Sequence, residues 1–304
     1  MKSTANILPP FLKKGDRIGI VGTARSVAQG QLDNISRLLT QDGFEVVLSP
    51  NIYSVSDRYA GDDASRTKAL QEMLDDDSFR AILCARGGYG TARMIDGLDW
   101  TRFLQNPKWI CGYSDVSVMH SHLNKLGVAS IHSTMGGAFT NFESDDLNFT
   151  SLIDELSGKP KNLNVVAHEL NRIGEVEAEL TGGNLAVLSS ILGSPSDTAW
   201  SGKILLIEDV LEYVYNLDRI MLNLKRNGRL ENLAGLIVGD FSERPEDDIP
   251  FGKTMYEVIS EHVSEYDYPV AFGFPIGHEK TNLAIRLGGQ VRLSVQSGPA
   301  SITY

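Results

Sequence analysis

A serine at a predicted strand-to-helix turn is the first residue of this sequence whose position suits chemistry. Residues 109–112 form a short apolar run typical of a buried strand, and residues 116–126 carry a helical pattern. Ser114 lies between them, so its hydroxyl should stand clear of the sheet, beside helix N–H groups without partners. A nucleophilic serine requires such an exposed oxygen with donors nearby. Val116 replaces the second glycine of the G-x-S-x-G elbow, and the alternative is a structural serine, as N-cap or turn residue.

A carboxylate and a histidine further along the chain could complete an acid–base set with this serine. Glu208 follows the strongly apolar run 204–207, and Asp209 competes with it for the same role. Strand alternation points the two side chains to opposite faces, so we expect only one of them to reach a site. His278 ends the glycine-rich segment 273–278, which leaves its ring free to project into a cleft or into solvent. A serine, an imidazole and a carboxylate together can activate a hydroxyl for nucleophilic attack.

Two glycine-rich turns resemble nucleotide motifs only in part. Gly19-Ile-Val-Gly22 lacks the third glycine of the dinucleotide fingerprint, and Arg86-Gly-Gly-Tyr-Gly90 lacks the Lys-Ser/Thr ending of a phosphate loop. The sequence therefore disfavours a nicotinamide site and nucleotide hydrolysis. The second turn has two interpretations: a tight connection between a strand and a helix, or a set of exposed N–H groups that bind an anion or an oxyanion.

The histidines and cysteines do not have the spacing of a metal site. No His-x-x-x-His or Cys-x-x-Cys pair exists, so we expect no metal and no cofactor. His120 and His122 lie two residues apart on a predicted helix, and we expect them on the surface or between domains. Cys84 and Cys111 each lie within an apolar run, which predicts buried thiols in a reducing compartment.

Strands alternate with helices in the first half of the chain. We predict strands at 17–22, 44–48, 80–85, 109–112 and 129–132, and helices at 31–41, 62–74 and 116–126. This alternation predicts an α/β domain with a mostly parallel sheet covered on both faces. Ligands of such sheets bind at the carboxyl ends of the strands, where both Ser114 and the turn 86–90 would lie.

The pattern changes near residues 156–177, where Ser157-Gly-Lys-Pro160 interrupts the chain. We therefore predict one domain over residues 1–160 and a second over residues 175–304. In the second we expect helices at 181–193, 215–227 and 255–263, and strands at 203–207, 233–238, 269–272 and 290–295. The cleft between two domains is the default place for a ligand, and the candidate residues come from both domains.

Composition limits the partners of this protein. The 304 residues suffice for two domains, and 28 basic against 39 acidic residues give a net charge of −11. This balance argues against nucleic acid or an anionic membrane as the main partner. Residues 1–12 lack the pattern of a signal peptide, and no apolar run approaches the length of a membrane span. We expect a cytoplasmic protein.

Five short motifs follow one another in a recognisable order. They are Arg86-Gly-Gly-Tyr-Gly90, Gly112-Tyr-Ser-Asp115, Thr181-Gly-Gly-Asn-Leu185, Leu206-Ile-Glu-Asp-Val210 with Asp218-Arg219, and Gly273-Phe-Pro-Ile-Gly-His278. With them the chain resembles the serine-type LD-carboxypeptidase (muramoyltetrapeptide carboxypeptidase) family, which also includes the microcin C immunity proteins. The resemblance covers nearly the whole chain. It implies Ser114 as nucleophile, Glu208 as the acid and His278 as the base, with an oxyanion hole from the N–H groups of Gly88 and Asp115.

The resemblance also implies a fold and an activity. The expected fold is an N-terminal flavodoxin-like α/β domain with a parallel sheet plus a C-terminal β-rich α/β domain, with the active site at their interface and usually a homodimer. The expected activity is removal of the terminal D-alanine from peptidoglycan-derived tetrapeptides, without a metal or cofactor. An exopeptidase must also bind a free carboxylate, and Arg86 is the nearest cation by sequence. The alternative is that Arg86 braces its turn through a buried salt bridge.

Two departures from the family pattern affect the predicted substrate. Ser-Thr-Met-Gly follows His132 where Gly-Pro-Met is common, and Leu-Ala-Ile-Arg follows Asn282 where Leu-Pro is common. The immunity branch is usually longer, which favours the carboxypeptidase branch. The alternative functions are an immunity-type peptidase that cleaves peptidyl- or aminoacyl-nucleotides and a non-catalytic module that binds an anion.

Overall fold

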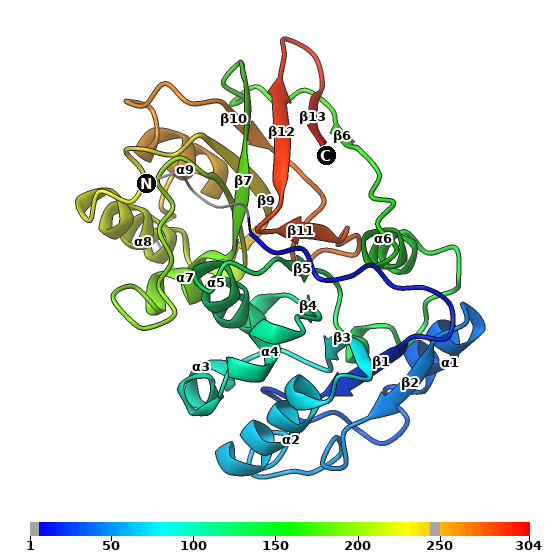
Figure 1. Cartoon of the computed structure of the whole chain (residues 1–304). Coiled ribbons are helices and arrows are strands. Elements are labelled where there is room, and N and C mark those ends of the chain that lie inside the picture. The colour runs from blue at the N-terminus through cyan, green and yellow to red at the C-terminus, as the bar shows by residue number, and fades with distance from the viewer. Residues whose placement is uncertain (1–5, 244–249) are drawn as a thin grey trace.

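Two β-sheets organise the chain, and Figure 1 shows them one above the other. The computed structural model describes residues 6–243 and 250–304. The first sheet has the strand order β11-β5-β4-β3-β1-β2, and the second has the order β10-β9-β8-β7-β12-β13-β6. The first is mostly parallel and the second is mixed, which confirms the predicted α/β fold of two domains.

The first sheet contains all five strands predicted for the N-terminal half. They are β1 (Arg17–Val21), β2 (Glu45–Leu48), β3 (Phe79–Cys84), β4 (Trp109–Gly112) and β5 (Ser130–His132). These strands pair in parallel in the flavodoxin-like order 2-1-3-4-5. A sixth strand, β11 (Ile285–Leu287), comes from the C-terminal half and pairs antiparallel with β5. The sequence did not predict β11, because three residues are too few for a periodic signal.

Helices flank this sheet on both faces. They are α1 (Asp33–Gln41), α2 (Asp63–Asp75), α3 (Thr91–Met94), α4 (Thr101–Gln105), α5 (Ser117–Lys125) and α6 (Leu147–Leu156). The sequence predicted α1, α2 and α5 but missed the other three. Cys84 and Cys111 are buried and free, as predicted.

The second sheet combines parallel and antiparallel pairs. Its strands are β6 (Leu163–Val165), β7 (Gly174–Asn184), β8 (Ile204–Glu212), β9 (Gly235–Glu243), β10 (Val270–Phe272), β12 (Gln290–Val295) and β13 (Ala300–Thr303). Strands β7 to β10 pair in parallel, whereas β12 is antiparallel to both β7 and β13. The helices are α7 (Leu185–Ser190), α8 (Val214–Arg226) and α9 (Met255–His262).

One prediction for this half was wrong in a way that matters for the site. Residues 181–184, which we expected to begin a helix, end strand β7 instead. Gly182 explains why: a Cβ there would lie 1.9 Å from the carbonyl oxygen of Leu206 on the neighbouring strand β8. The glycines therefore allow close pairing of two strands, and the helix begins only at Leu185. The predicted closing strand is also not the last, because β13 follows β12.

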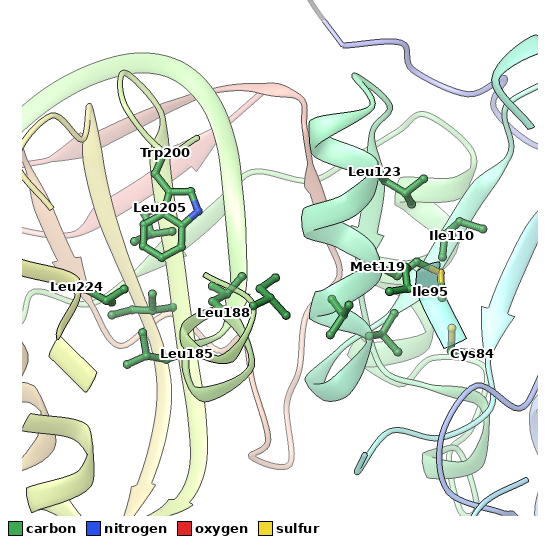
Figure 2. Close-up of a cluster of buried hydrophobic side chains, with 14 of the residues drawn as sticks. Cys84, Ile95, Ile110, Met119, Leu123, Leu185, Leu188, Trp200, Leu205 and Leu224 are labelled. Carbon is green, nitrogen blue, oxygen red and sulfur yellow. The ribbon is translucent and has the colours of Figure 1, made fainter. Parts of the chain in front are cut away.

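Helix α5 joins the two sheets. A single buried hydrophobic cluster includes Met119 and Leu123 of α5 together with Leu188 of α7, and Figure 2 shows these helices packed side by side. Beside this cluster, the Glu179 carboxylate of β7 accepts hydrogen bonds from Asn124 Nδ2 at 2.6 Å and from Lys203 Nζ at 2.7 Å. The apolar contact and the hydrogen bond from Asn124 together fix α5, and the turn that precedes it, against the second sheet.

Candidate active site

Ser114 lies at a strained turn directly after strand β4. Its φ of 61° falls in the left-handed region, which a non-glycine residue rarely adopts. Residues Ser114–Val116 form a short 3₁₀ turn that continues into α5. The turn requires glycine at position 112, since a Cβ there would lie 2.9 Å from Val116 Cγ2. This is the strand–turn–helix geometry of a nucleophile elbow.

The hydroxyl of Ser114 has no structural task in the described part of the chain. The 3₁₀ turn begins after Tyr113 and α5 after Val116, and neither helix start is capped by a side chain. Among residues 6–243 and 250–304, Ser114 Oγ makes no hydrogen bond. The alternative of a helix-capping serine is therefore wrong.

Glu208 and His278 form a buried hydrogen-bonded pair. Glu208 lies in the middle of β8, which extends to Glu212 and does not end at the predicted residue 207, and it is fully buried. Its Oε2 is 2.7 Å from Nδ1 of His278. His278 follows a loop anchored by two buried side chains, Phe274 and Ile276. Gly277 permits the approach, since a Cβ there would lie 3.3 Å from Cβ of Glu208 and 2.9 Å from Cβ of Asp240.

The environment shifts the pKa values of both groups in this pair. Burial alone would raise the pKa of Glu208, but its contacts with His132 and His278 outweigh burial and hold that pKa below the ordinary value. Burial would lower the pKa of His278, but the hydrogen bond and charge of Glu208 outweigh it and raise that pKa. A carboxylate on Nδ1 fixes the proton there and leaves Nε2 of the imidazole free to accept another.

Ser114 and His278 line the same cavity, which has a volume of about 440 Å³. It is lined by Arg25, Gln31, Ala85, Arg86, Gly87, Gly88, Tyr113, Ser114, Met135, Gly137, Ala138, Val210 and His278. The Gly87–Gly88 turn packs directly on the serine, because a Cβ at Gly87 would lie 3.2 Å from Ser114 Cβ. The structure thus brings Ser114, His278 and Gly88 to one cavity, with Glu208 behind the imidazole.

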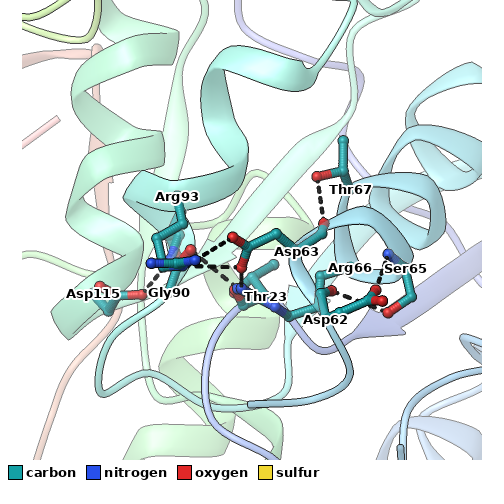
Figure 3. Close-up of polar contacts among 10 residues, drawn as sticks. Thr23, Asp62, Asp63, Ser65, Arg66, Thr67, Gly90, Arg93 and Asp115 are labelled. Carbon is teal, nitrogen blue, oxygen red and sulfur yellow. Dashed lines mark hydrogen bonds and ion pairs between the residues drawn. The ribbon is translucent and has the colours of Figure 1, made fainter. Parts of the chain in front are cut away.

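Polar contacts fix the glycine-rich turn against the elbow. The carboxylate of Asp115 accepts a hydrogen bond from the Thr91 N–H at 2.9 Å, as Figure 3 shows. Arg66, which is fully buried, donates to the carbonyl oxygens of Thr23 and Gly90 and pairs with Asp63. The N–H groups of Gly88 and Asp115 have no acceptor among the described residues, so both remain available to an oxyanion.

Within the part of the chain that the structure describes, Arg86 forms no salt bridge, so the alternative of a bracing salt bridge was wrong. Its side chain is exposed, and its Nη1 donates to the carbonyl oxygen of Ser26 at 3.1 Å. The bracing arginine is Arg66 of α2, which the sequence did not single out. The sequence also gave no role to Arg25, which lines the cavity beside Arg86.

Asp209 and Glu208 face opposite ways, as strand alternation predicted. Asp209 accepts hydrogen bonds from Asn184 Nδ2 and from the Ala186 N–H, both at 2.9 Å. It therefore binds the first turn of α7 and does not contact His278. Burial, followed by the nearby charge of Glu208, raises the pKa of Asp209 to about 6.

The histidines outside the pair were predicted less well. His120 is buried in the N-terminal domain, hydrogen-bonded to the Gly112 carbonyl oxygen and to Ser130, and the prediction of a surface or interdomain position was wrong for it. His122 does contact Ser196 beyond α7, between the two parts of the chain. His132, which the sequence did not single out, is fully buried with Nε2 3.8 Å from Glu208 Oε1.

One protein family matches the sequence along most of the chain. The model of the LD-carboxypeptidase N-terminal domain matches residues 18–133, and that of the LD-carboxypeptidase C-terminal domain matches residues 177–293. The chain therefore belongs to the LD-carboxypeptidase family. Within the described ranges no helix is long and apolar enough to cross a membrane, and no group of three or more metal-ligating side chains is found.

Two curated relatives carry names that specify murein peptides. A probable murein peptide carboxypeptidase of Bacillus subtilis is 30% identical over 98% of this chain and 94% of its own length. The murein tetrapeptide carboxypeptidase of Pseudomonas aeruginosa is 27% identical over 88% of this chain and 90% of its own. A crystal structure of muramoyltetrapeptide carboxypeptidase from Oxalobacter formigenes superposes with a TM-score of 0.86 at 27% identity, covering 94% and 97% of the two chains.

The immunity proteins share the fold to the same degree. The microcin C7 self immunity protein MccF superposes with a TM-score of 0.86 at 22% identity, covering 98% of each chain. At this identity the likeness shows the fold alone.

Proposed function

We propose that this protein is a serine-type LD-carboxypeptidase that removes the terminal D-alanine from peptidoglycan-derived tetrapeptides in murein recycling. The observation that carries the proposal is the buried Glu208–His278 pair, joined at 2.7 Å, whose imidazole shares a cavity with the strained Ser114. The names of two relatives that are 30% and 27% identical support the substrate class.

In the proposed reaction Ser114 Oγ attacks the carbonyl carbon that precedes the terminal D-alanine. His278 Nε2 accepts the hydroxyl proton and then delivers it to the amine as the C–N bond breaks, which frees D-alanine and leaves an acyl ester on Ser114. Water, deprotonated by the same imidazole, attacks the ester and regenerates the serine. Glu208 holds the imidazole tautomer and stabilises its charged form.

The N–H groups of Gly88 and Asp115 form the oxyanion hole in this proposal. Both lack an acceptor among the described residues, and both belong to turns that meet at Ser114. Removal of one such donor typically lowers turnover by about 100- to 1,000-fold. Because Arg66 and Asp115 hold the glycine-rich turn in place, these donors need little rearrangement when charge develops.

The test is to incubate the protein with a peptidoglycan tetrapeptide, with lysine or diaminopimelate as its third residue, and to measure released D-alanine by mass spectrometry. The same peptide ending in L-alanine is the matched substrate control. We expect release from the D-peptide only, and none from a Ser114→Ala variant. Absence of release from both D-peptides, or an unchanged Ser114→Ala variant, would overturn the proposal.

The side chains that line the cavity argue against the immunity-type alternative. An adenine ring would call for an exposed aromatic face to stack on. Tyr113 is the aromatic residue among the described lining residues, and its ring already packs on His278 with centroids 4.7 Å apart. This favours a peptide over a nucleotide. An aminoacyl adenylate offered to the same protein should remain intact.

The proposal also covers the cellular location, oligomeric state, partners and domain boundaries of the enzyme. We propose that it acts in the cytoplasm as a homodimer without a metal or cofactor, with no nucleic acid or membrane partner, and with domains over residues 1–160 and 175–304. The two free, buried thiols and the net charge of −11 support the location and the absence of polyanionic partners. Light scattering after gel filtration measures the oligomeric state directly.

A further inference from the structure

An exopeptidase of the proposed kind must recognise a carboxylate one residue beyond the bond that it cleaves. Two arginines, Arg25 and Arg86, line the cavity that contains Ser114. Guanidinium groups match a carboxylate with two parallel N–H donors, so either could be the anchor. The two arginines differ in the hydrogen bonds that they already make, and this difference indicates which one is free to bind the carboxylate.

Arg25 is the arginine with an uncommitted side chain. Its backbone N–H donates to the Gly87 carbonyl oxygen at 3.3 Å, which ties its loop to the glycine-rich turn. Within residues 6–243 and 250–304, however, its guanidinium makes no hydrogen bond and no ion pair. Arg86, in contrast, already uses Nη1 on the carbonyl oxygen of Ser26. A partly buried guanidinium with five unused donors is well placed to bind an anion.

The stem of Arg25 lies flat on Gly88. A Cβ at Gly88 would lie 2.6 Å from Cδ and 3.1 Å from Nε of Arg25. On the other side of the same dipeptide, a Cβ at Gly87 would lie 3.4 Å from Ser114 Oγ. Successive Cα atoms are about 3.8 Å apart, so the serine and the guanidinium flank a single dipeptide.

The length of a terminal residue fits this arrangement. The carboxylate carbon of the leaving D-alanine is two atoms beyond the scissile nitrogen, which puts it at roughly 4 Å from the carbonyl carbon that Ser114 attacks. Because Arg25 and Ser114 line the same cavity, an anchor at Arg25 favours a substrate whose free carboxylate lies close to the scissile bond.

The charge of the residues that line the cavity also favours binding of a carboxylate. The chain carries a net charge of −11, yet the described residues that line the cavity include two arginines and neither aspartate nor glutamate. A cationic pocket in an acidic protein concentrates an anionic ligand at that place.

We propose that the Arg25 guanidinium binds the free terminal carboxylate of the substrate and so makes the site specific for carboxypeptidase cleavage, with Arg86 a secondary charge. The inference rests on the proposed function, because it names the subsite for the leaving residue.

The experiment compares Arg25→Met with the matched variant Arg86→Met on two substrates. Methionine keeps an unbranched apolar stem and removes the charge. The substrates are a tetrapeptide with a free terminal carboxylate and the same peptide as a terminal amide. For Arg25→Met we expect kcat/KM on the free carboxylate to fall by about 10- to 100-fold, the effect of a lost hydrogen bond to a charged group, with less change on the amide. Arg86→Met should keep most of the preference for the carboxylate.

A binding measurement separates this inference from the proposed function. Calorimetry with the Ser114→Ala protein should show tighter binding of the free tetrapeptide than of its amide, and this difference should vanish when Arg25→Met is added. If the wild-type protein releases no D-alanine, the proposed function fails, whereas the calorimetric difference still reports on Arg25. Equal loss on both substrates for Arg25→Met, or loss of the carboxylate preference in Arg86→Met alone, would overturn the inference.

Discussion

Replacement of Glu208 by glutamine isolates the charge of the buried pair, because the two side chains have nearly the same shape. Glu208 is fully buried and accepts from His278 Nδ1 at 2.7 Å. Glutamine can offer its NH₂ group to Nδ1 instead. That contact stabilises the tautomer with the proton on Nε2, which cannot accept the proton of Ser114.

We expect a loss of about 10⁴-fold in kcat, the effect seen when a buried triad carboxylate becomes an amide in other serine hydrolases. At ~1.36 kcal/mol for each factor of ten, this corresponds to about 5 kcal/mol of transition-state stabilisation. The pH dependence gives a second, independent signature. Glu208 raises the pKa of His278, so its removal lowers that pKa. The acid limb of kcat/KM, which reports the protonation of His278, should move to lower pH in Glu208→Gln.

Asp209→Asn is the matched control, because it removes a neighbouring buried acid that binds α7 and not His278. Both variants are assayed for D-alanine release between pH 5 and pH 9 (roughly the range over which a histidine titrates), and the titration of His278 is followed by NMR. Glu208→Gln should lose activity and shift the His278 titration downward, whereas Asp209→Asn should mainly lower the melting temperature. If Glu208→Gln retained most of its activity, or if both variants were equally impaired, the assignment of the acid would be refuted.

Three further outcomes follow from the same geometry. Ser114→Ala should lower kcat by about 10⁴-fold or more, and a small loss would contradict a nucleophilic role. The melting temperature should change little, because the Ser114 hydroxyl makes no hydrogen bond among the described residues. Gly88→Ala should lower D-alanine release by about tenfold or more, because φ is +108° there and a Cβ would meet Arg25 Cδ at 2.6 Å, and unchanged kinetics would contradict this packing. Gly182→Ala should reduce the yield of folded protein or its melting temperature, because a Cβ would lie 1.9 Å from the Leu206 carbonyl oxygen, and a normal melting curve would contradict the close strand pairing.

The five parallel strands of the first sheet could be predicted from the sequence because each is a short apolar run followed by a turn, whereas helices α3, α4 and α6 were missed. Strand β4 was predicted with its observed bounds, and the helix after Ser114 was predicted to within one residue at each end. Strand β11 could not be predicted, because its three residues gain their order from pairing with β5, far away in the sequence. Long-range pairing of this kind leaves no periodic signal in so short a segment.

For the candidate site, the sequence indicates which residues could react, but it does not show which distant side chains the fold brings next to them. Ser114, Glu208 and His278 could be singled out because each follows a recognisable strand or glycine-rich turn. The cationic subsite could not, because adjacency in sequence favours Arg86. Arg25 follows β1, and β1 neighbours β3, which in turn neighbours β4. The loops at the carboxyl ends of these parallel strands therefore meet, and they bring Arg25 to Ser114.

Two consecutive acids in the middle of β8, Glu208 and Asp209, show how strand register gives neighbouring side chains different partners. Asn184 of β7 is paired in register with Glu208, while its side chain binds Asp209 on the opposite face. Glu208 faces His278 and His132, so its pKa is held below the ordinary value, whereas burial raises that of Asp209 to about 6. A shift of register by one residue would exchange the two faces and present His278 with the acid that now binds α7. The close pairing of β7 with β8, which Gly182 permits, therefore determines which of the two acids meets the imidazole.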